Sequence, residues 1–474
     1  MKKFFVTTPI YYISAEPSIG SACTTMAADV LARLHRQLGE EVFFLTGTDE
    51  HGEKVAEVAS KAGLSPIDYC NQIAPKYIEA WKLLNINYDF FIRTTDLRHE
   101  KVVGEVLQKI YNNGDVYKGK YEGWYCTGCE EFKTDKELVD GHCPLHPPEK
   151  TVLKSEENWF FKLSKYVPNI VELIENQETN YIFPEGKKSE VLAKLKAGVN
   201  DVSISREKVK WGIPVPWDKD HTIYVWIDAL INYYSATQFV EGKADFWPAN
   251  LHLLGKEILW FHTVIWQAML LSAGIDIPRK TYIHDFYTID GQKMSKSLGN
   301  TIPPKELVDL FGVDGARYLI ARSFPYNGDV DVGIARFKEK FNADLANNLG
   351  NLVSRVCKLG IGLKLKTPLG SAESPLEEGE KYSKLIDDLK FDEAIGWVFE
   401  NFVDKSNNRL NEVTPWKLEP ADPKRVEVLT ECAMNLQQAA IHLKSIMPTV
   451  SQKILEVLDG EIKPLETGLF PRIK

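Results

Sequence analysis

Residues 3–12 have the sequence KFFVTTPIYY, an apolar, aromatic and β-branched stretch that predicts a buried strand. A helical pattern covers residues 19–37, and a second apolar stretch covers residues 41–47. A strand, a helix and a strand with short connections predict the start of a doubly wound parallel sheet. Because ligands of such sheets bind at the carboxyl ends of the strands, we expect residues 18–21 and Asp49 to lie near each other.

Further strands are predicted near residues 222–227, 251–255 and 281–287, whereas residues after about 335 carry helical periodicity. Residues from about 116 are rich in aromatic residues, Cys, Gly and Pro, which indicates an inserted domain. The predicted fold class is therefore α/β, with a doubly wound parallel (Rossmann-type) sheet, an inserted zinc-knuckle domain and a C-terminal α-helical bundle. The predicted domains are a first half of the sheet domain (1–115), the insertion (116–220), a second half (221–290), a linking domain (291–340) and a helical domain (341–474).

The composition is typical of a globular protein, with 44% hydrophobic and 26% charged residues in 474 residues. No apolar run of about 18 residues occurs, so we expect no membrane span. The first residues lack a signal-peptide pattern, and we expect a cytoplasmic protein. The net charge of −9 argues against non-specific coating of nucleic acid, although a local basic face could still recognise a folded RNA.

Four potential metal ligands occur as two knuckles. Two residues separate Cys126 from Cys129, two separate Cys143 from His146, and thirteen residues separate the knuckles. Thiolates and an imidazole at this spacing predict a closed, structural, tetrahedral Zn2+ site. The alternatives are a dithiol and an unliganded loop. The odd total of seven cysteines favours a reducing compartment over a disulfide framework.

A second informative stretch is GQKMSKSLGN at residues 291–300, where Lys293 and Lys296 alternate with hydroxyl residues. Ammonium groups, hydroxyls and backbone N–H groups on such a loop can enclose a polyphosphate. The KMSKS run resembles the signature loop of class I aminoacyl-tRNA synthetases, which activate an amino acid with ATP. The second signature of that family is His-Ile-Gly-His, but residues 18–21 are Ser-Ile-Gly-Ser here.

Further strings resemble the methionyl-tRNA synthetase family, and the resemblance covers essentially the whole chain. They are TTPIYY (7–12), GTDEHG (47–52), WGIPVP (211–216), VWIDALINY (225–233), GKE (255–257) and FH (261–262). The resemblance implies methionine, ATP with Mg2+ and tRNA(Met) as substrates.

The resemblance also implies roles for individual residues. The methionine side-chain pocket would be formed by Ile10, Tyr12, Trp226, Tyr233 and His262, and Asp49 would hold the ammonium group. An aromatic wall suits a polarisable thioether. ATP would contact Gly20, Gly255, Glu257 and Lys296, with Lys293 as a helper for the phosphates.

Ser18 and Ser21 are expected at a helix N-terminus, where backbone N–H groups and the helix dipole favour an anion. Serine is shorter than histidine and stays neutral. Losing one preorganised donor typically slows a reaction by roughly two to three orders of magnitude. We therefore expect these two residues to take part in catalysis with impaired methionine activation.

Three residues of the helical domain would read the tRNA anticodon, by the same resemblance. Asn351 and Arg355 are one helical turn apart, and Trp416 offers a ring on which a base can stack. No appended tRNA-binding or dimerisation module follows these helices, so we expect a monomer, with any extra tRNA affinity supplied by a partner in trans.

The leading hypothesis is a methionine–tRNA ligase. Two alternatives remain: a catalytically weakened protein that still binds methionine, ATP or tRNA, and an adenylating paralogue with an acceptor other than tRNA.

Overall fold

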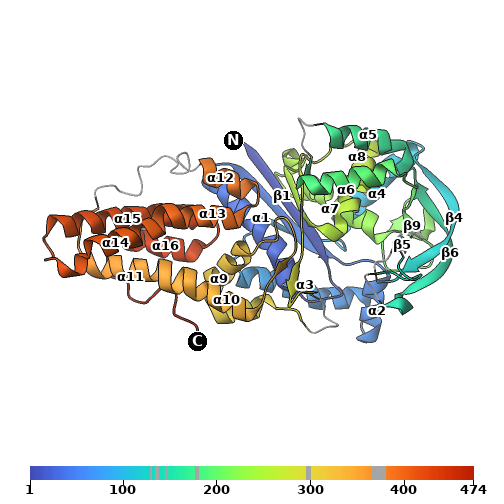
Figure 1. Ribbon diagram of the computed structural model, residues 1–474. Helices are drawn as coiled ribbons and strands as arrows, with labels where there is room; N and C mark the ends of the chain where they lie inside the picture. Colours follow the sequence, from blue (N-terminus) through green and yellow to red (C-terminus); the bar gives the residue numbers. More distant parts are fainter. Residues whose placement is uncertain (129–130, 134–137, 145–146, 177–180, 295–299, 366–379) are drawn as a thin grey trace.

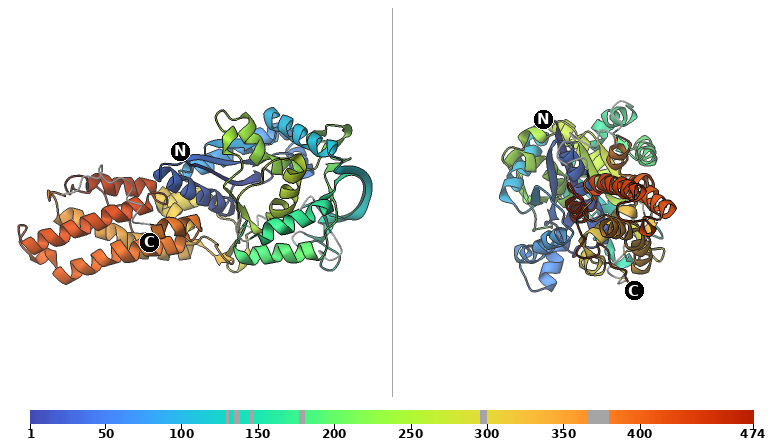
Figure 2. Two further views of the ribbon diagram at one scale, coloured as in Figure 1. Left: turned by 90° about the horizontal axis from the view of Figure 1, so that it is seen from above. Right: turned by 90° about the vertical axis from the view of Figure 1, so that its left-hand side faces the viewer.

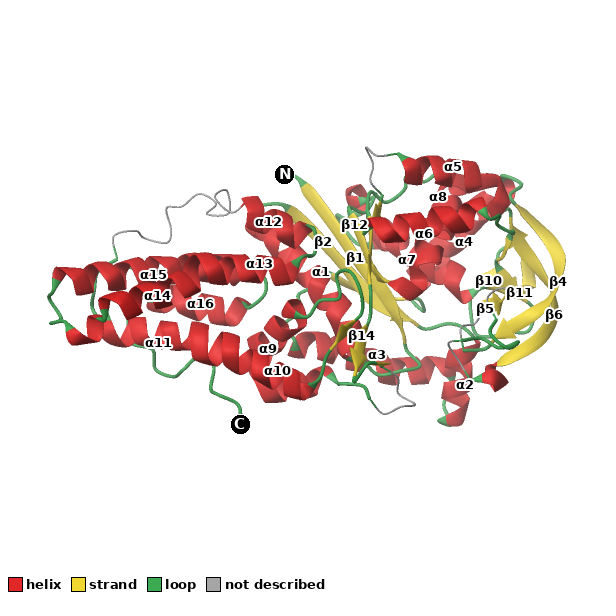
Figure 3. Cartoon of the chain, in the orientation of Figure 1, coloured by secondary structure: helices red, strands yellow, loops and turns green. Residues whose placement is uncertain are grey.

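A six-stranded parallel sheet forms the centre of the chain (Figures 1 and 3). The structure is a computed structural model that describes residues 1–474 apart from 129–130, 134–137, 145–146, 177–180, 295–299 and 366–379. The strand order is β3 (Phe90–Arg93), β2 (Glu41–Asp49), β1 (Lys3–Tyr12), β12 (Leu251–Gly255), β13 (Thr281–His284) and β7 (Ile182–Phe183). Every neighbouring pair is parallel. The predicted α/β class with a parallel sheet is confirmed.

Side chains of β1 alternate between two separate cores, because successive strand residues point to opposite faces. Phe4 and Val6 pack in one core with α1, and Phe5 packs in the other. Helices therefore cover both faces of the sheet, which explains why β1 is apolar on both sides. These helices are α1 (Ile19–Gln37), α3 (Pro66–Leu83), α4 (Leu97–Asn112), α7 (Val225–Phe239), η5 (Phe261–Ile265) and α8 (Trp266–Ala273), whereas α2 (Glu53–Lys61) packs against α3.

The strand predicted at residues 222–227 is wrong in its second half. Strand β11 ends at Ile223 and belongs to a three-stranded antiparallel sheet, and α7 begins at Val225. Most of α7 is buried, so its apolar residues form a continuous run without the helical period that a half-exposed helix shows. The strand predicted at residues 281–287 likewise ends early, because β14 (Tyr287–Ile289) joins a different sheet.

The segment between β3 and β12 contains a second, four-stranded sheet of order β5-β4-β6-β8. Its long strands β4 and β6 pair antiparallel over eleven residue pairs. Strand β7 lies within this segment but pairs with β13 of the central sheet. The elements are β4 (Val116–Cys126), β5 (Glu131–Lys133), β6 (Thr151–Phe161), α5 (Leu163–Glu175), α6 (Glu185–Lys196), β8 (Val202–Ser203), β9 (Ser205–Arg206), β10 (Pro214–Val215) and β11 (Asp218–Ile223).

The C-terminal region is helical, as predicted, and extends away from the sheet (Figure 2). Its helices are α9 (Pro304–Arg322), α10 (Ile334–Lys340), η7 (Phe341–Leu349), α11 (Gly350–Leu359), α12 (Glu380–Asp387), α13 (Phe391–Val398), η8 (Phe399–Asp404), α14 (Lys405–Val413), α15 (Pro423–Leu443) and α16 (Pro448–Val457). Among the described residues, no helix is both long enough and apolar enough to cross a membrane.

A buried ion pair joins the sheet region to the helical region. The guanidinium of Arg317 on α9 is fully buried and lies 2.7 Å from the carboxylate of Asp29 on α1. Arg317 also donates to three carbonyls, those of Leu84 at 3.0 Å, Ser445 at 2.9 Å and Ile446 at 2.7 Å. A buried charge is tolerated only when it is paired and hydrogen-bonded, and Arg317 meets both conditions.

Candidate functional site

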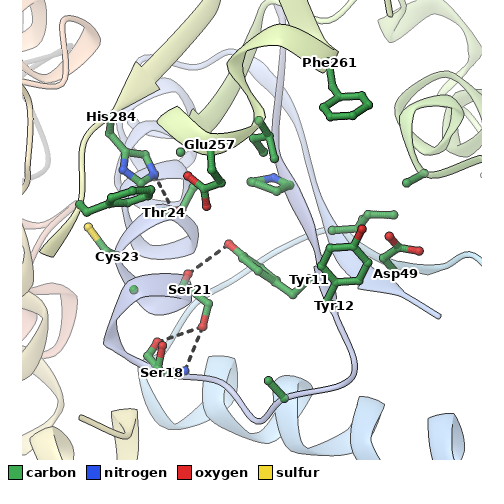
Figure 4. A pocket seen from close by; sticks show the side chains of 18 of the residues that line it. Tyr11, Tyr12, Ser18, Ser21, Cys23, Thr24, Asp49, Glu257, Phe261 and His284 are labelled. Atoms are coloured by element: carbon green, nitrogen blue, oxygen red, sulfur yellow. Dashed lines mark hydrogen bonds between the residues drawn. The ribbon is translucent and has the colours of Figure 1, made fainter. Parts of the chain in front are cut away.

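A cavity of about 580 Å³ lies at the carboxyl ends of β1, β2 and β12, beside the start of α1 (Figure 4). This is the edge at which an open parallel sheet binds its ligands. The cavity wall contains the predicted residues Ile10, Tyr12, Ser18, Gly20, Ser21, Asp49, Trp226, Tyr233, Gly255, Glu257 and His262. Of the two predicted lysines, Lys293 ends β15 (Gln292–Lys293), and Lys296 lies outside the described residues.

The start of α1 is closed by hydrogen bonds between the two serines. The hydroxyl of Ser21 donates to the backbone oxygen of Ser18 at 2.9 Å and accepts from the backbone N–H of Ser18 at 3.0 Å. Ser18 is extended and precedes the first helical residue, as an N-cap residue does. Figure 4 shows both serines at the same side of the cavity. The proton of Ser21 is therefore already used within the loop.

The two signature segments touch each other. The backbone N–H of Ile19 donates to the carbonyl of Ile302 at 2.8 Å. A Cβ atom at Gly20 would lie 3.4 Å from the methyl carbon of Met294, which also lines the cavity. Met294 and Ile302, which flank residues 295–299, thus both lie close to the start of α1.

One wall of the cavity is aromatic. The ring of Trp226 stacks on Phe261 with centroids 4.3 Å apart and meets the ring of Tyr12 edge-on at 5.7 Å. The Tyr233 hydroxyl lies 2.8 Å from Nε2 of His262. Burial lowers the pKa of His262 to about 4, so this imidazole is neutral at pH 7. The wall is thus aromatic and uncharged.

Two carboxylates face the same cavity from different strands. Asp49 is the last residue of β2 and is 2% exposed, so its charge lies in a nearly dry environment. Glu257 follows β12, and a Cβ atom at Gly255 would lie 2.5 Å from its carboxylate oxygen. Glycine at position 255 therefore leaves the space that the Glu257 carboxylate occupies.

A buried hydrogen-bond chain supports the aromatic wall from behind. Asp228 on α7 accepts from Nδ1 of His51 at 2.6 Å and from Nε2 of His99 at 2.8 Å. His99 contacts the hydroxyl of Ser235 at 2.7 Å through its other ring nitrogen. Because His51 follows β2 by two residues, the chain fixes α7 against the strand that ends at Asp49.

The charges of this chain stabilise each other. Burial opposes the charge on His51, but the Asp228 carboxylate outweighs burial and raises the pKa of His51. Burial also opposes the charge on Asp228, but His51 and then His99 outweigh it and lower the pKa of Asp228. Each group therefore favours the charged form of the other.

Sequence reasoning missed several cavity residues. The hydroxyl of Thr24 on α1 is 2.7 Å from Nε2 of His284. Nδ1 of the same ring donates to the carbonyl of Asp285 at 2.7 Å. Cys23 is buried in the wall beside them (Figure 4). The one available signal for His284 was its position at the end of β13, where the ligand edge of the sheet lies.

The predicted anticodon residues lie together on the helical region. The guanidinium carbon of Arg355 is 4.9 Å from the ring centre of Trp416, and its Nη2 donates to Asn411 at 3.2 Å. Asn351 is exposed one turn earlier on α11, and the Trp416 side chain is 44% exposed. An exposed indole beside a guanidinium and an amide offers the groups that bind unstacked RNA bases.

Two of the four predicted zinc ligands, Cys129 and His146, lie outside the described residues. The other two are buried, and both contact Thr151. Cys126 is the cross-strand neighbour of Thr151, and the backbone N–H of Cys143 donates to the Thr151 hydroxyl at 3.0 Å. The fold thus brings one cysteine of each knuckle to the same residue. Within the described ranges, no group of three or more His, Cys, Asp and Glu residues is placed to bind a metal ion.

A family model described as "tRNA synthetases class I (M)" matches residues 4–151 and 146–357. The methionine–tRNA ligase of Caldanaerobacter subterraneus subsp. tengcongensis is 41% identical over 476 residues, covering 96% of this chain and 74% of that protein. The chain belongs to the class I methionyl-tRNA synthetase family. The methionine–tRNA ligase of Thermotoga maritima is also 41% identical, over 98% of this chain and 77% of that protein.

Solved structures of the family agree. The Mycobacterium tuberculosis methionyl-tRNA synthetase in complex with methionyl-adenylate matches with a TM-score of 0.89 and 32% identity, and each chain is covered completely. The free form of that synthetase gives a TM-score of 0.83 and 28% identity, with 100% of this chain and 99% of that chain covered.

We expect Asp228→Asn to lower the free energy of unfolding by about 3–5 kcal/mol, because it leaves two buried imidazoles without their carboxylate. The contribution of Asp228 to the free energy of unfolding is lost as pH falls through its lowered pKa. The contribution of His51 is lost as pH rises through its raised pKa. The difference between the two proteins should therefore be largest between about pH 4 and pH 6.5. Urea unfolding at a series of pH values measures this difference.

Asp309→Asn is the matched control, since Asp309 pairs with Lys305 on the surface. An exposed pair contributes at most about 1 kcal/mol. Equal losses in the two variants would contradict a role for the buried chain.

Proposed function

We propose that this protein is a methionine–tRNA ligase, which forms methionyl-adenylate from methionine and ATP and transfers methionine to tRNA(Met). One observation carries this proposal: the aromatic wall, Asp49, Glu257 and the start of α1 all line one cavity at the ligand edge of the sheet. The likeness to a synthetase that was solved with methionyl-adenylate supports it.

Methionine would bind against the aromatic wall. The stacked rings of Trp226 and Phe261, together with Tyr12, offer the polarisable surface that a thioether favours. The carboxylate of Asp49 would hold the ammonium group, since a charge in this dry wall attracts an opposite charge strongly. The methionine carboxylate would then point toward the start of α1.

ATP would occupy the other end of the cavity. Glu257 would accept hydrogen bonds from ribose hydroxyls, and the absence of a side chain at Gly255 leaves room for this. The methionine carboxylate attacks the α-phosphate, a new O–P bond forms, and pyrophosphate leaves. Lys296 and Lys293 would stabilise the charge that develops on the phosphate oxygens, so that catalysis is mostly positioning and electrostatic stabilisation.

We further propose that this activation step is slow. The hydroxyl of Ser21 donates within its own loop, and the N–H groups of Ser18 and Ile19 are also occupied. A phosphate at this helix start would have to break a bond to gain a donor from Ser21. The same geometry favours the alternative function, a protein that binds methionine, ATP and tRNA but turns over little.

Methionine-dependent exchange of pyrophosphate into ATP should be detectable in the parent chain and rise by roughly two to three orders of magnitude in Ser18→His/Ser21→His. Imidazole N–H groups would supply the missing donors. Lys296→Ala in the double variant serves as the control and should abolish the gain.

No exchange in the parent together with robust exchange in the double variant would favour the binding protein. If neither protein exchanges pyrophosphate into ATP at any methionine concentration, the proposed ligase activity is rejected.

The helical region would recognise the anticodon through Trp416, Arg355 and Asn351. We expect Trp416→Ala to weaken tRNA(Met) binding by about ten-fold or more, since stacking contributes roughly 1–3 kcal/mol per base. Pyrophosphate exchange should stay unchanged, because it needs no tRNA. Equilibrium binding of tRNA(Met), with Trp124→Ala as an exposed-tryptophan control on β4, tests this role. Equal losses in both variants would argue against anticodon reading by Trp416.

We propose that Cys126, Cys129, Cys143 and His146 hold a structural Zn2+. The burial of Cys126 and Cys143 beside Thr151 supports this, because a closed zinc site has buried thiolates. Bound zinc would stabilise the fold of the insertion.

Elemental analysis should find one zinc per chain, and Cys143→Ser should lower that content and the thermal stability together. A metal-free parent with unchanged stability would contradict the site.

A further inference from the structure

The cavity wall carries more negative than positive charge. The described residues that line it include four carboxylates, those of Glu16, Asp49, Glu257 and Asp285. Burial lowers the pKa of His262 and of His284 to about 4, so both imidazoles in the wall are neutral at pH 7. Among the described lining residues, Lys133 is the only lysine and none is an arginine. Lys133 is therefore the described source of positive charge in this wall.

Lys133 belongs to the insertion and not to the sheet domain. It is the last residue of β5, which pairs with β4 of the insertion. Its side chain is half-buried, and the cavity that it lines also contains Ser18 and Ser21 at the start of α1. Gly128, in the turn that follows β4, lines the same cavity. The insertion thus forms part of the cavity wall.

Ion pairs hold the insertion next to the ligand edge of the sheet. The ammonium group of Lys154 on β6 lies 3.0 Å from the carboxylate of Glu53, and that of Lys150 lies 3.9 Å from Glu57. Both carboxylates belong to α2, which follows the end of β2 at Asp49. Because β5, β4 and β6 are neighbours in one sheet, these contacts also constrain where β5 lies relative to the cavity.

A phosphate ligand of this cavity needs positive charge. The lining carboxylates oppose a phosphate, since like charges repel strongly at short range in a partly dry site. The hydroxyl of Ser21 already donates to the backbone oxygen of Ser18 at 2.9 Å. An ammonium group acts as a point charge on phosphate oxygens, and its hydrogen bonds to them are stronger than those between neutral groups. Lys133 has the charge that such a ligand requires.

We propose that Lys133 is a phosphate-binding residue of this cavity, which the insertion contributes. The inference rests on the proposed function, because that function brings two phosphate ligands to the site. These are the triphosphate of ATP and the terminal phosphodiester of tRNA(Met), which present the same charged oxygens. The ligase reaction uses them in separate steps, so the contact with each can be tested alone.

Lys133→Met removes the charge and keeps most of the length of the side chain, whereas Lys133→Arg keeps the charge. If Lys133 contacts the triphosphate, Lys133→Met should weaken ATP binding by about ten-fold or more, as expected for a hydrogen bond between charged groups. The KM for ATP in pyrophosphate exchange should rise to the same extent, and Lys133→Arg should retain most of the affinity. Calorimetric titration with ATP in the absence of methionine measures the affinity without turnover.

A contact with the end of the tRNA gives a different result. In that case ATP affinity and pyrophosphate exchange stay unchanged in Lys133→Met. The transfer of methionine from added methionyl-adenylate to tRNA(Met) should then slow by about ten-fold or more, for the same reason. A single-turnover assay of the transfer step measures this rate, and Lys133→Arg should again resemble the parent.

Lys120→Met is the matched control, since Lys120 is exposed on β4 of the insertion and does not line the cavity. It should leave both steps unchanged. Normal ATP affinity together with normal transfer in Lys133→Met would overturn the inference, as would a loss confined to methionine affinity or equal losses in Lys120→Met. A parent that binds neither methionine nor ATP would instead reject the proposed function.

Reductive methylation of lysines, followed by mass spectrometry, tests the contact in the parent chain itself. Saturating ATP or tRNA(Met) should protect Lys133 from modification, and the ligand that protects it identifies the source of the phosphate. Lys120 should be modified at the same rate with and without either ligand. If neither ligand protects Lys133, the inference is wrong.

Discussion

The pairing of Arg317 with Asp29 holds the two halves of this molecule in one arrangement. Asp29 lies on α1, the same helix whose first turn contributes Ser18 and Ser21 to the cavity. Asp29 also accepts from Arg33 and from the backbone N–H of Asn87, so both carboxylate oxygens are used. Because the guanidinium bonds carbonyls of the α15–α16 connection, α1 cannot shift without disturbing the helical region.

The cavity depends on a second buried charge, Asp228. This residue places no group in the cavity, but it fixes the helix that contributes Trp226 and Tyr233. Most of the side chains that line the cavity lie near strand ends and the starts of helices, and buried ion pairs behind them set their positions. Preorganised groups of this kind bind ligands at lower entropic cost than flexible ones.

The sequence predicts the parallel sheet well, because β1 and β2 are apolar on both faces and short turns separate them from α1. The sequence misplaces the start of α7, since the apolar residues of a helix that is buried on most sides show no helical period. The residues of the cavity wall could be predicted because the ends of the predicted strands coincide there with segments that resemble the methionyl-tRNA synthetase family. The hydrogen-bond partners of Asp228 could not be predicted, because His51 and His99 are 177 and 129 residues away in the sequence and no local pattern joins them to Asp228.

The position of β1 has a consequence during synthesis on the ribosome. Its neighbour β2 follows after about thirty residues, but its other neighbour, β12, begins at Leu251. Until the whole insertion has been translated, one side of β1 presents unpaired N–H and C=O groups next to apolar side chains. Open strand edges of this kind attract other chains. The nascent chain therefore carries an open strand edge for about half of its elongation, and we expect fragments that end before residue 251 to aggregate more readily than the whole chain.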